Sequence, residues 1–189
     1  MPEQPILSFE NAGAFRQWLA LHHAAHPGIW MRLAKKGSGI ASVTYAEALD
    51  EALCFGWIDG QKKSFDQNEY LQKFTRRGPR SIWSQINTGH IERLTREARM
   101  QAAGLAAVEA AKADGRWDAA YQPFSAAAMP QDFLAALGKH KAARTFFESL
   151  NKSNTYAIVF RVTTAKKPET RAKRIASIIA MLQRGETFH

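Results

Sequence analysis

The sequence predicts an α+β protein, with a small antiparallel sheet of about three strands and helices, followed by a helical C-terminal half. Residues 29–34 alternate between inward and outward side chains, as a half-buried strand does. Residues 57–66 and 69–76 are two strand-like segments joined by a short polar turn, which predicts a hairpin. After Arg80, apolar residues recur at helical spacing almost to the end of the chain.

Two helices are predicted in the sheet-containing half. Residues 9–25 place Phe15, Trp18 and Leu19 on one face, and the helix ends before a Pro-Gly pair. A second helix is predicted from Tyr45 to Cys54. Thr44 lies three residues before Glu47, the spacing of a capping box, in which each side chain bonds the other residue's backbone N–H.

The C-terminal half is predicted to be a series of helices that follow a stretch with Ser81 and Ser84 as candidate caps. The segments with helical spacing are 101–112, 130–138, 142–150, 155–165 and 168–184. We therefore expect a sheet-containing part at residues 1–120 and a helical part at 121–189, packed as one unit. Residues 121–129 are the linker candidate.

Composition limits the environment and the partners of the protein. The chain of 189 residues has a formal net charge of +9 and a pI near 9.9. Such a surface attracts nucleic acid, anionic lipid or acidic small molecules. A single cysteine excludes an internal disulfide and favours a reducing compartment. No secretory signal or long apolar run is visible, so we expect a cytoplasmic protein without membrane insertion.

Basic side chains around a predicted helix start indicate an anion-binding site. Arg76, Arg77 and Arg80 lie within five positions. Guanidinium groups bind phosphate or carboxylate through a planar fork, and the N–H groups of a helix start favour the same anion. The expected binding residues are Lys35, Lys36, Trp57, Asp59, Arg76, Arg77, Arg80, Ser81, Trp83, Ser84 and Asn87.

Two alternatives remain open for these residues. The charged side chains can form a solvated rim, partly paired with nearby carboxylates. Trp57 and Trp83 can either line the site or fill the core of a small domain. In the binding interpretation, Asp59 orients one of the arginines.

Other chemistry-bearing residues lack the pattern that catalysis or metal binding requires. Cys54 is predicted at a helix C-terminus, which does not activate a thiolate, so we expect a buried thiol. His22 and His26 have a metal-ligand spacing but no further ligands nearby. Asp59 and Asp66 are an odd number of residues apart, so a regular strand sends them to opposite faces. No nucleotide-binding glycine loop or nucleophile elbow is present either. The sequence therefore assigns no metal, no cofactor and no catalytic residue.

The segment Ala-Leu-Asp-Glu-Ala-Leu-Cys-Phe-Gly-Trp-Ile-Asp-Gly, residues 48–60, resembles the YdeI/OmpD-associated, or bacteriocin-protection (OmdA-like), family. The resemblance continues in order over nearly the whole chain, through positions 74–87, 92–94, 100–105, 111–117, 165–171 and 174–175. Arg76 stands where the family usually carries proline, and Ala98 where it usually carries glycine. The resemblance implies a bacterial cytoplasmic protein with a broad role in stress or toxin resistance, and it assigns no reaction.

Three functions follow from these observations. The first is a non-enzymatic module that binds an anionic small molecule or nucleic acid, the choice between them left open. The second is an enzyme of unknown reaction that uses Cys54, Asp59, Ser81 or Asn87 in the same cleft. The third is a protein-interaction factor of a resistance pathway, in which the alanine-rich helices and the basic last helix contact a protein partner.

Overall fold

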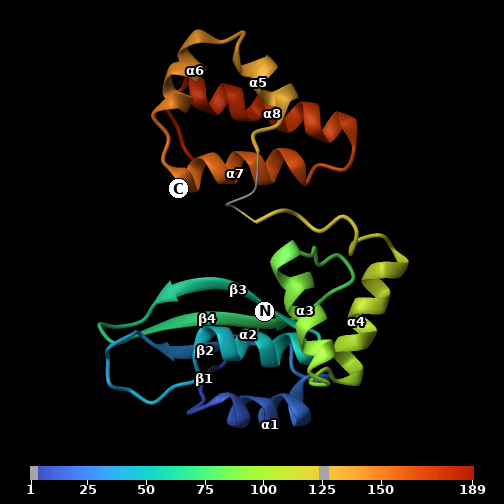
Figure 1. Cartoon of the computed structure of the whole chain (residues 1–189). Helices are drawn as coiled ribbons and strands as arrows, with labels where there is room; N and C mark the ends of the chain where they lie inside the picture. The colour runs from blue at the N-terminus through green and yellow to red at the C-terminus, as the bar shows by residue number, and fades with distance from the viewer. Residues whose placement is uncertain (1–3, 124–127) are drawn as a thin grey trace. The chain divides into compact units, whose positions relative to one another are not determined.

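A computed structural model of the chain describes residues 4–123 and 128–189 (Figure 1). It confirms the α+β class, with a sheet in the first half of the chain and helices in the second. The chain divides into two compact units, Met1–Ala120 and Tyr121–His189. Of the predicted linker, residues 124–127 lie outside the described residues. The packing of the two parts as one unit stays a prediction.

The N-terminal unit contains a four-stranded sheet, one strand more than expected. The strands run in the order β1-β2-β4-β3, with β1 parallel to β2 and the other neighbours antiparallel. The additional strand has only three residues, too few to show an alternating pattern in the sequence. The elements are β1 (Ile6–Ser8), α1 (Ala12–His22), β2 (Gly28–Ala34), α2 (Tyr45–Cys54), β3 (Trp57–Ser64), β4 (Glu69–Arg76), α3 (Gln85–Arg96) and α4 (Ala102–Ala113).

One face of the sheet carries the core of this unit. Ile29, Met31 and Leu33 of β2 are buried, whereas the residues between them are half-buried, as the alternation predicts. Phe15 of α1 packs against Phe74 of β4, with ring centroids 5.8 Å apart. Helix α2 joins the same core through its buried alanines and leucines.

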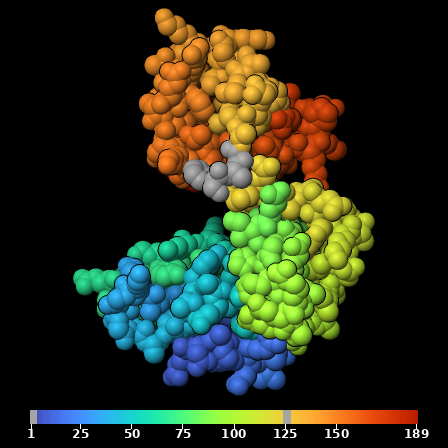
Figure 2. Space-filling view, in the orientation of Figure 1, coloured from blue at the N-terminus to red at the C-terminus, as the bar shows by residue number. Residues whose placement is uncertain are grey.

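Helix α2 begins at a capping box and ends at a glycine turn. At the start, the predicted capping box is present: Glu47 N donates to Thr44 Oγ1, and Thr44 N donates to the Glu47 carboxylate. At the end, the chain turns at Gly56, whose φ is +73°. Helix α4 comes so close there that a Cβ atom on Gly104 would collide with the Cys54 carbonyl oxygen. Helices α3 and α4 each contact α2, and in the space-filling view their green and yellow-green atoms lie beside the cyan atoms of α2 (Figure 2).

The C-terminal unit is built from α5 (Gln131–Leu137), α6 (Lys141–Glu148), α7 (Lys152–Thr163) and α8 (Pro168–Gln183). Helix α8 lies between α7 and the pair formed by α5 and α6 (Figure 1). Its buried residues are those that the spacing predicted: Ile175, Ile178, Ile179 and Leu182. Within the part of the chain that the structure describes, every helix is too short or too polar to cross a lipid bilayer.

Candidate anion-binding site

The structure places the predicted binding residues at two ends of β4. Lys35 and Lys36 follow β2, whose last residue, Ala34, pairs with Glu69 at the start of β4. Arg76 is the last residue of β4. At about 3.3 Å per residue, the two ends of this strand are roughly 23 Å apart. The lysines and the arginines therefore belong to separate surfaces.

At the arginine end, the guanidinium groups contact backbone carbonyls and an aromatic ring. Arg76 Nη1 donates to the Ala24 carbonyl over 2.8 Å. Arg77 Nη1 donates to the Ile82 carbonyl over 3.0 Å, and its guanidinium carbon lies 3.6 Å from the centroid of the Trp83 ring. These contacts join the end of β4 to the turn after α1, and Arg77 to the segment that follows it.

The helix that follows begins at one of the two candidate caps. Ser84 Oγ accepts a hydrogen bond from Asn87 N over 3.1 Å and caps α3. Ser81 Oγ instead accepts from Gly78 N over 2.9 Å, which closes a turn before the helix. Arg80, directly before Ser81 in the chain, is exposed.

Trp57 and Trp83 lie in the core. Their exposed fractions are 0% and 1%, which leaves almost no ring surface for a ligand. Trp57 Nε1 donates to the His23 carbonyl over 3.1 Å. Asp59 accepts a hydrogen bond from the Tyr45 hydroxyl over 2.8 Å, whereas the binding interpretation predicts an arginine as its partner.

At the lysine end there is a pocket of about 600 Å³, which we call the lysine pocket. Three lysines line it, and no lining residue is an aspartate or a glutamate. Two of the lysines were predicted, and the third, Lys62, comes from β3. The lining residues are Ala34, Lys35, Lys36, Ser42, Val43, Thr44, Tyr45, Lys62 and Tyr70.

Contacts within the lysine pocket hold two of its cations in place. Lys35 Nζ donates to the Asp66 and Gln67 carbonyls over 2.7 and 3.2 Å. Lys62 Nζ lies 4.1 Å from the centroid of the Tyr70 ring. Burial raises the pKa of the Tyr70 phenol, so the phenol stays protonated at neutral pH and remains a hydrogen-bond donor. The start of α2 at this pocket is capped by Thr44 and by the Glu47 carboxylate.

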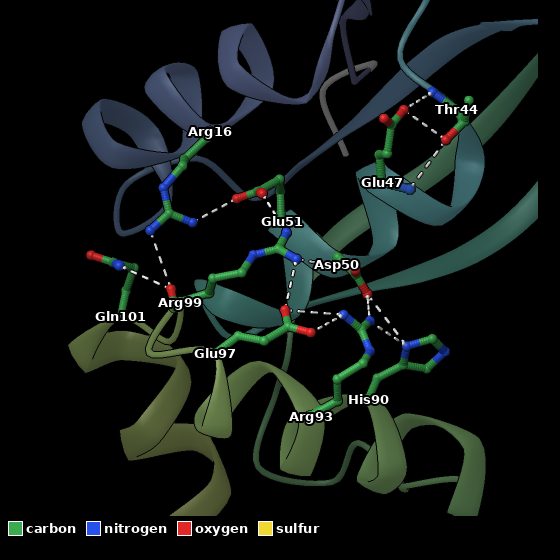
Figure 3. A network of polar contacts seen from close by, with 10 residues as sticks. All are labelled: Arg16, Thr44, Glu47, Asp50, Glu51, His90, Arg93, Glu97, Arg99 and Gln101. Atoms are coloured by element: carbon green, nitrogen blue, oxygen red, sulfur yellow. Dashed lines mark hydrogen bonds and ion pairs between the residues drawn. The ribbon is translucent and has the colours of Figure 1, made fainter.

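A second polar cluster joins α2 to its neighbours around Glu51 (Figure 3). The Glu51 side chain is only 6% exposed. Its two oxygens each accept one guanidinium: Arg16 Nη1 lies 2.7 Å from Oε2, and Arg99 Nη2 lies 2.7 Å from Oε1. The hydrogen bond to Glu51 raises the pKa of Arg16, so this guanidinium stays charged. The Glu51 cluster thus links α1 and the segment before α4 to α2.

The neighbouring carboxylates extend this cluster to α3. Asp50 Oδ1 lies 2.6 Å from Arg93 Nη2 and 3.3 Å from His90 Nδ1. Glu97 accepts from Arg93 and from Arg99 over 3.2 Å each. Three carboxylates thus meet three guanidinium groups, a balance that favours a structural clamp over the capture of an external anion.

Sequence reasoning missed the role of Glu51, although a signal exists. Ala48, Glu51 and Ala52 are at i, i+3 and i+4 on the face of α2 that the pattern marks as buried. A carboxylate on that face requires cations from elsewhere in the fold. Their identity depends on which helices pack there, which spacing within α2 does not reveal.

The geometry at the α3 C-terminus shows why glycine is the expected residue at position 98. Ala98 has a φ of +53°, and Arg99 N donates to the Leu94 carbonyl over 3.0 Å. Together with the bond from Ala98 N to the Thr95 carbonyl, this is a Schellman motif, whose left-handed position usually carries glycine. Ala98 therefore occupies a strained position directly before Arg99, which completes the Glu51 cluster.

The cysteine and the two histidines with metal-ligand spacing pack against other side chains of the N-terminal unit. Cys54 is fully buried, and burial is the largest cause that raises the pKa of its thiol. His22 and His26 pack their rings near Trp18, at centroid distances of 4.9 and 5.4 Å. In residues 4–123 and 128–189, no group of three or more His, Cys, Asp or Glu side chains is placed to hold a metal ion.

Comparison with known families separates the two halves of the chain. The family described as a domain of unknown function (DUF8412) matches residues 7–107. The family described as Bacteriocin-protection, YdeI or OmpD-Associated matches residues 126–185. The resemblance to the second family is thus confirmed, but the match covers the helical part, and residues 48–60 lie in the match to the first. No curated protein and no solved structure matches the chain. The chain therefore belongs to the DUF8412 family, and its helical part carries a region of the bacteriocin-protection, YdeI or OmpD-associated family.

Proposed function

We propose that the protein is a non-enzymatic module that binds a small phosphorylated or carboxylated molecule in the lysine pocket. One observation carries the proposal: three lysines from two segments surround a single hollow whose lining contains no carboxylate. Three like charges gathered in one lining cost free energy, which an anionic ligand recovers. The Glu51 cluster, with its balanced charges, offers no such gain.

The size of the lysine pocket and its hydrogen-bond donors favour a small molecule over a polymer. Its volume of about 600 Å³ is within the range of small-ligand sites. Lys62 and the Tyr70 phenol supply donors from the sheet, and Lys36 supplies a further ammonium from the loop after β2. Nucleic acid would require a longer basic surface that follows the phosphate backbone.

The chemistry of the lining supports binding without catalysis. A general base or nucleophile needs a pKa moved toward neutrality. Burial moves the pKa of Tyr70 in the opposite direction, and the Cys54 thiol lies inside the core. The C-terminal match supports a place in bacteriocin or stress resistance, and the single cysteine supports a cytoplasmic location; both are part of the proposal.

Two adjacent lysines of β3 give a matched test. Lys62 lines the lysine pocket, whereas Lys63 lies 4.4 Å from the Trp30 ring centroid, away from the pocket lining. We expect pyrophosphate, citrate or ATP to bind in titration calorimetry and to bind roughly tenfold more weakly to Lys62→Gln, the effect of one charge-assisted hydrogen bond. Lys63→Gln removes the same charge and should bind these anions nearly as well as the unchanged protein.

Two results would contradict the proposal. If Lys62→Gln and Lys63→Gln weaken anion binding equally, the loss of affinity reflects net charge alone and not the lysine pocket. Alternatively, labelled single-stranded DNA can be titrated by fluorescence anisotropy at low and high salt. Tight binding that falls steeply with salt and is unchanged in Lys62→Gln would assign the protein to nucleic acid through another surface.

A further inference from the structure

The excess positive charge of this protein is concentrated in its C-terminal unit. Residues 121–189 contain 11 of the 26 lysines and arginines but only 4 of the 17 aspartates and glutamates, which leaves +7 of the net charge of +9. Three of those four carboxylates already pair with arginines: Asp132 with Arg171, Glu148 with Arg144, and Glu186 with Arg184. Most of the cations in this unit therefore have no carboxylate partner among the described residues.

Some of these cations border a groove between α7 and α8, which we call the α7/α8 groove. Its volume is about 580 Å³. Arg161, Lys173 and Arg174 supply three positive charges, and none of the lining residues is acidic. Phe160, Ile178 and Phe188 supply the apolar surface, and Thr164, Thr170 and Ser177 supply hydroxyl groups. This groove is in a different unit from the lysine pocket.

Both guanidinium groups are held by neutral partners. Arg174 Nη1 donates to the Arg161 carbonyl over 2.7 Å and lies 3.3 Å from Thr164 Oγ1. The Arg161 guanidinium carbon lies 3.8 Å from the centroid of the Phe188 ring. Carbonyls and rings orient these side chains but leave their charge uncompensated. The α7/α8 groove is thus preorganised for an anion at no cost in breaking ion pairs.

The apolar lining adds a second requirement for the ligand. A purely ionic ligand such as phosphate would leave the half-buried rings of Phe160 and Phe188 in contact with water. A ligand with an apolar body and one anionic group would cover these side chains and place its charge beside Lys173 and Arg174. We propose that the α7/α8 groove binds an amphipathic anion, such as a medium-chain carboxylate.

The proposal can be tested in the full chain with a fluorescent fatty acid, dansyl-aminoundecanoic acid. Its emission should rise on binding, and decanoate below its micelle-forming concentration should displace it. Acetate lacks the chain and decanol lacks the charge, so each should displace the probe at least about tenfold less well than decanoate. If decanol displaces the probe as well as decanoate does, the ligand is merely apolar and the proposed anion site is wrong.

Charge variants locate the binding. Lys173→Gln should weaken probe binding about fivefold to tenfold, because it removes one of the positive charges of the groove. Lys173 is exposed, so its loss leaves the helices intact. Lys141→Gln removes another exposed lysine, in α6 and outside the α7/α8 groove, and should leave the affinity unchanged. Equal weakening by both variants would overturn the proposal.

A third variant tests the apolar surface and keeps the two sites separate. Phe188→Ala should weaken displacement by decanoate more than it weakens displacement by acetate, since it removes ring surface and no charge. Lys62→Gln in the lysine pocket should not change probe binding. Unchanged affinity in both Lys173→Gln and Phe188→Ala would contradict the inference and leave the proposed function of the lysine pocket unaffected.

Discussion

Glu51 and Arg99 form an ion pair of 2.7 Å in which the carboxylate is almost fully buried and the guanidinium is one-third exposed. The pair joins the middle of α2 to the segment between α3 and α4. Arg16 of α1 binds the other oxygen of the same carboxylate. One buried side chain thus orders three parts of the N-terminal unit.

We expect Glu51→Gln to lower the free energy of unfolding of this unit by about 2–3 kcal/mol, because two guanidinium groups lose their carboxylate. Urea unfolding followed by tryptophan fluorescence measures this unit specifically, since all five tryptophans lie in residues 1–120. Glu92→Gln on the exposed surface of α3 is the control and should change stability by less than about 0.5 kcal/mol. Equal stability of the two variants would show that the buried ion pair contributes nothing.

Ala98→Gly should stabilise the N-terminal unit. The left-handed conformation of Ala98 costs an L-residue about 1–2 kcal/mol, part of which glycine loses again through its more flexible unfolded chain, so we expect a gain of about 0.5–1 kcal/mol. Ala106→Gly in the exposed interior of α4 should instead destabilise by about 1 kcal/mol. The same urea experiment compares them, and a loss of stability in Ala98→Gly would contradict the strain.

Gly104→Ala should destabilise because the added methyl group would meet the Cys54 carbonyl oxygen, which belongs to the rigid end of α2. Helix α4 has to move away, and we expect a cost of about 2–3 kcal/mol. Gly89→Ala is the matched control in α3: nothing lies within 4 Å of its added Cβ, so the better helix former should stabilise by about 0.5–1 kcal/mol. Thermal unfolding of both variants checks the opposite signs.

Cys54 should resist iodoacetamide in the folded protein at neutral pH. The thiol is fully buried, and burial raises its pKa, so both access and the thiolate fraction are low. Labelling should require opening of the N-terminal unit and should therefore accelerate in Glu51→Gln. Mass spectrometry of the modified chain over time provides the measurement, and rapid labelling of the unchanged protein would revive the enzyme hypothesis.

The C-terminal unit should lose stability in acid partly through Asp132. Hydrogen bonds from Arg171 lower the pKa of Asp132 below its ordinary value of about 3.9. The stabilisation is therefore fully present above that ordinary value and is lost as pH falls through the lowered one. The effect should be small, since the Asp132 side chain is 47% exposed. Circular dichroism during acid titration should show a weaker pH dependence for Asp132→Asn, and an identical curve would exclude this contribution.

The candidate site shows which sequence predictions depend on distance in space. The basic residues that were expected on one surface lie at the two ends of β4. Each residue of a strand adds about 3.3 Å to its length, so the strand holds the two groups apart. Lys62 joins Lys35 and Lys36 only because β3 and β2 both pair with β4 and the hollow at α2 lies beside them. No local pattern in the chain specifies that meeting.

The sequence alone determined the features that depend on residues close together in the chain. The capping box at Thr44 and Glu47, the alternation in β2, the apolar face of α8 and the burial of Cys54 depend on residues close in the chain, and each appears as predicted. The strand Ile6–Ser8, the guanidinium partners of Glu51 and the split of the basic residues depend on contacts between distant segments. Backbone propensity acts over a few residues, whereas charge pairing and pocket shape depend on how the helices pack on the sheet, and these features therefore emerge only in the folded chain.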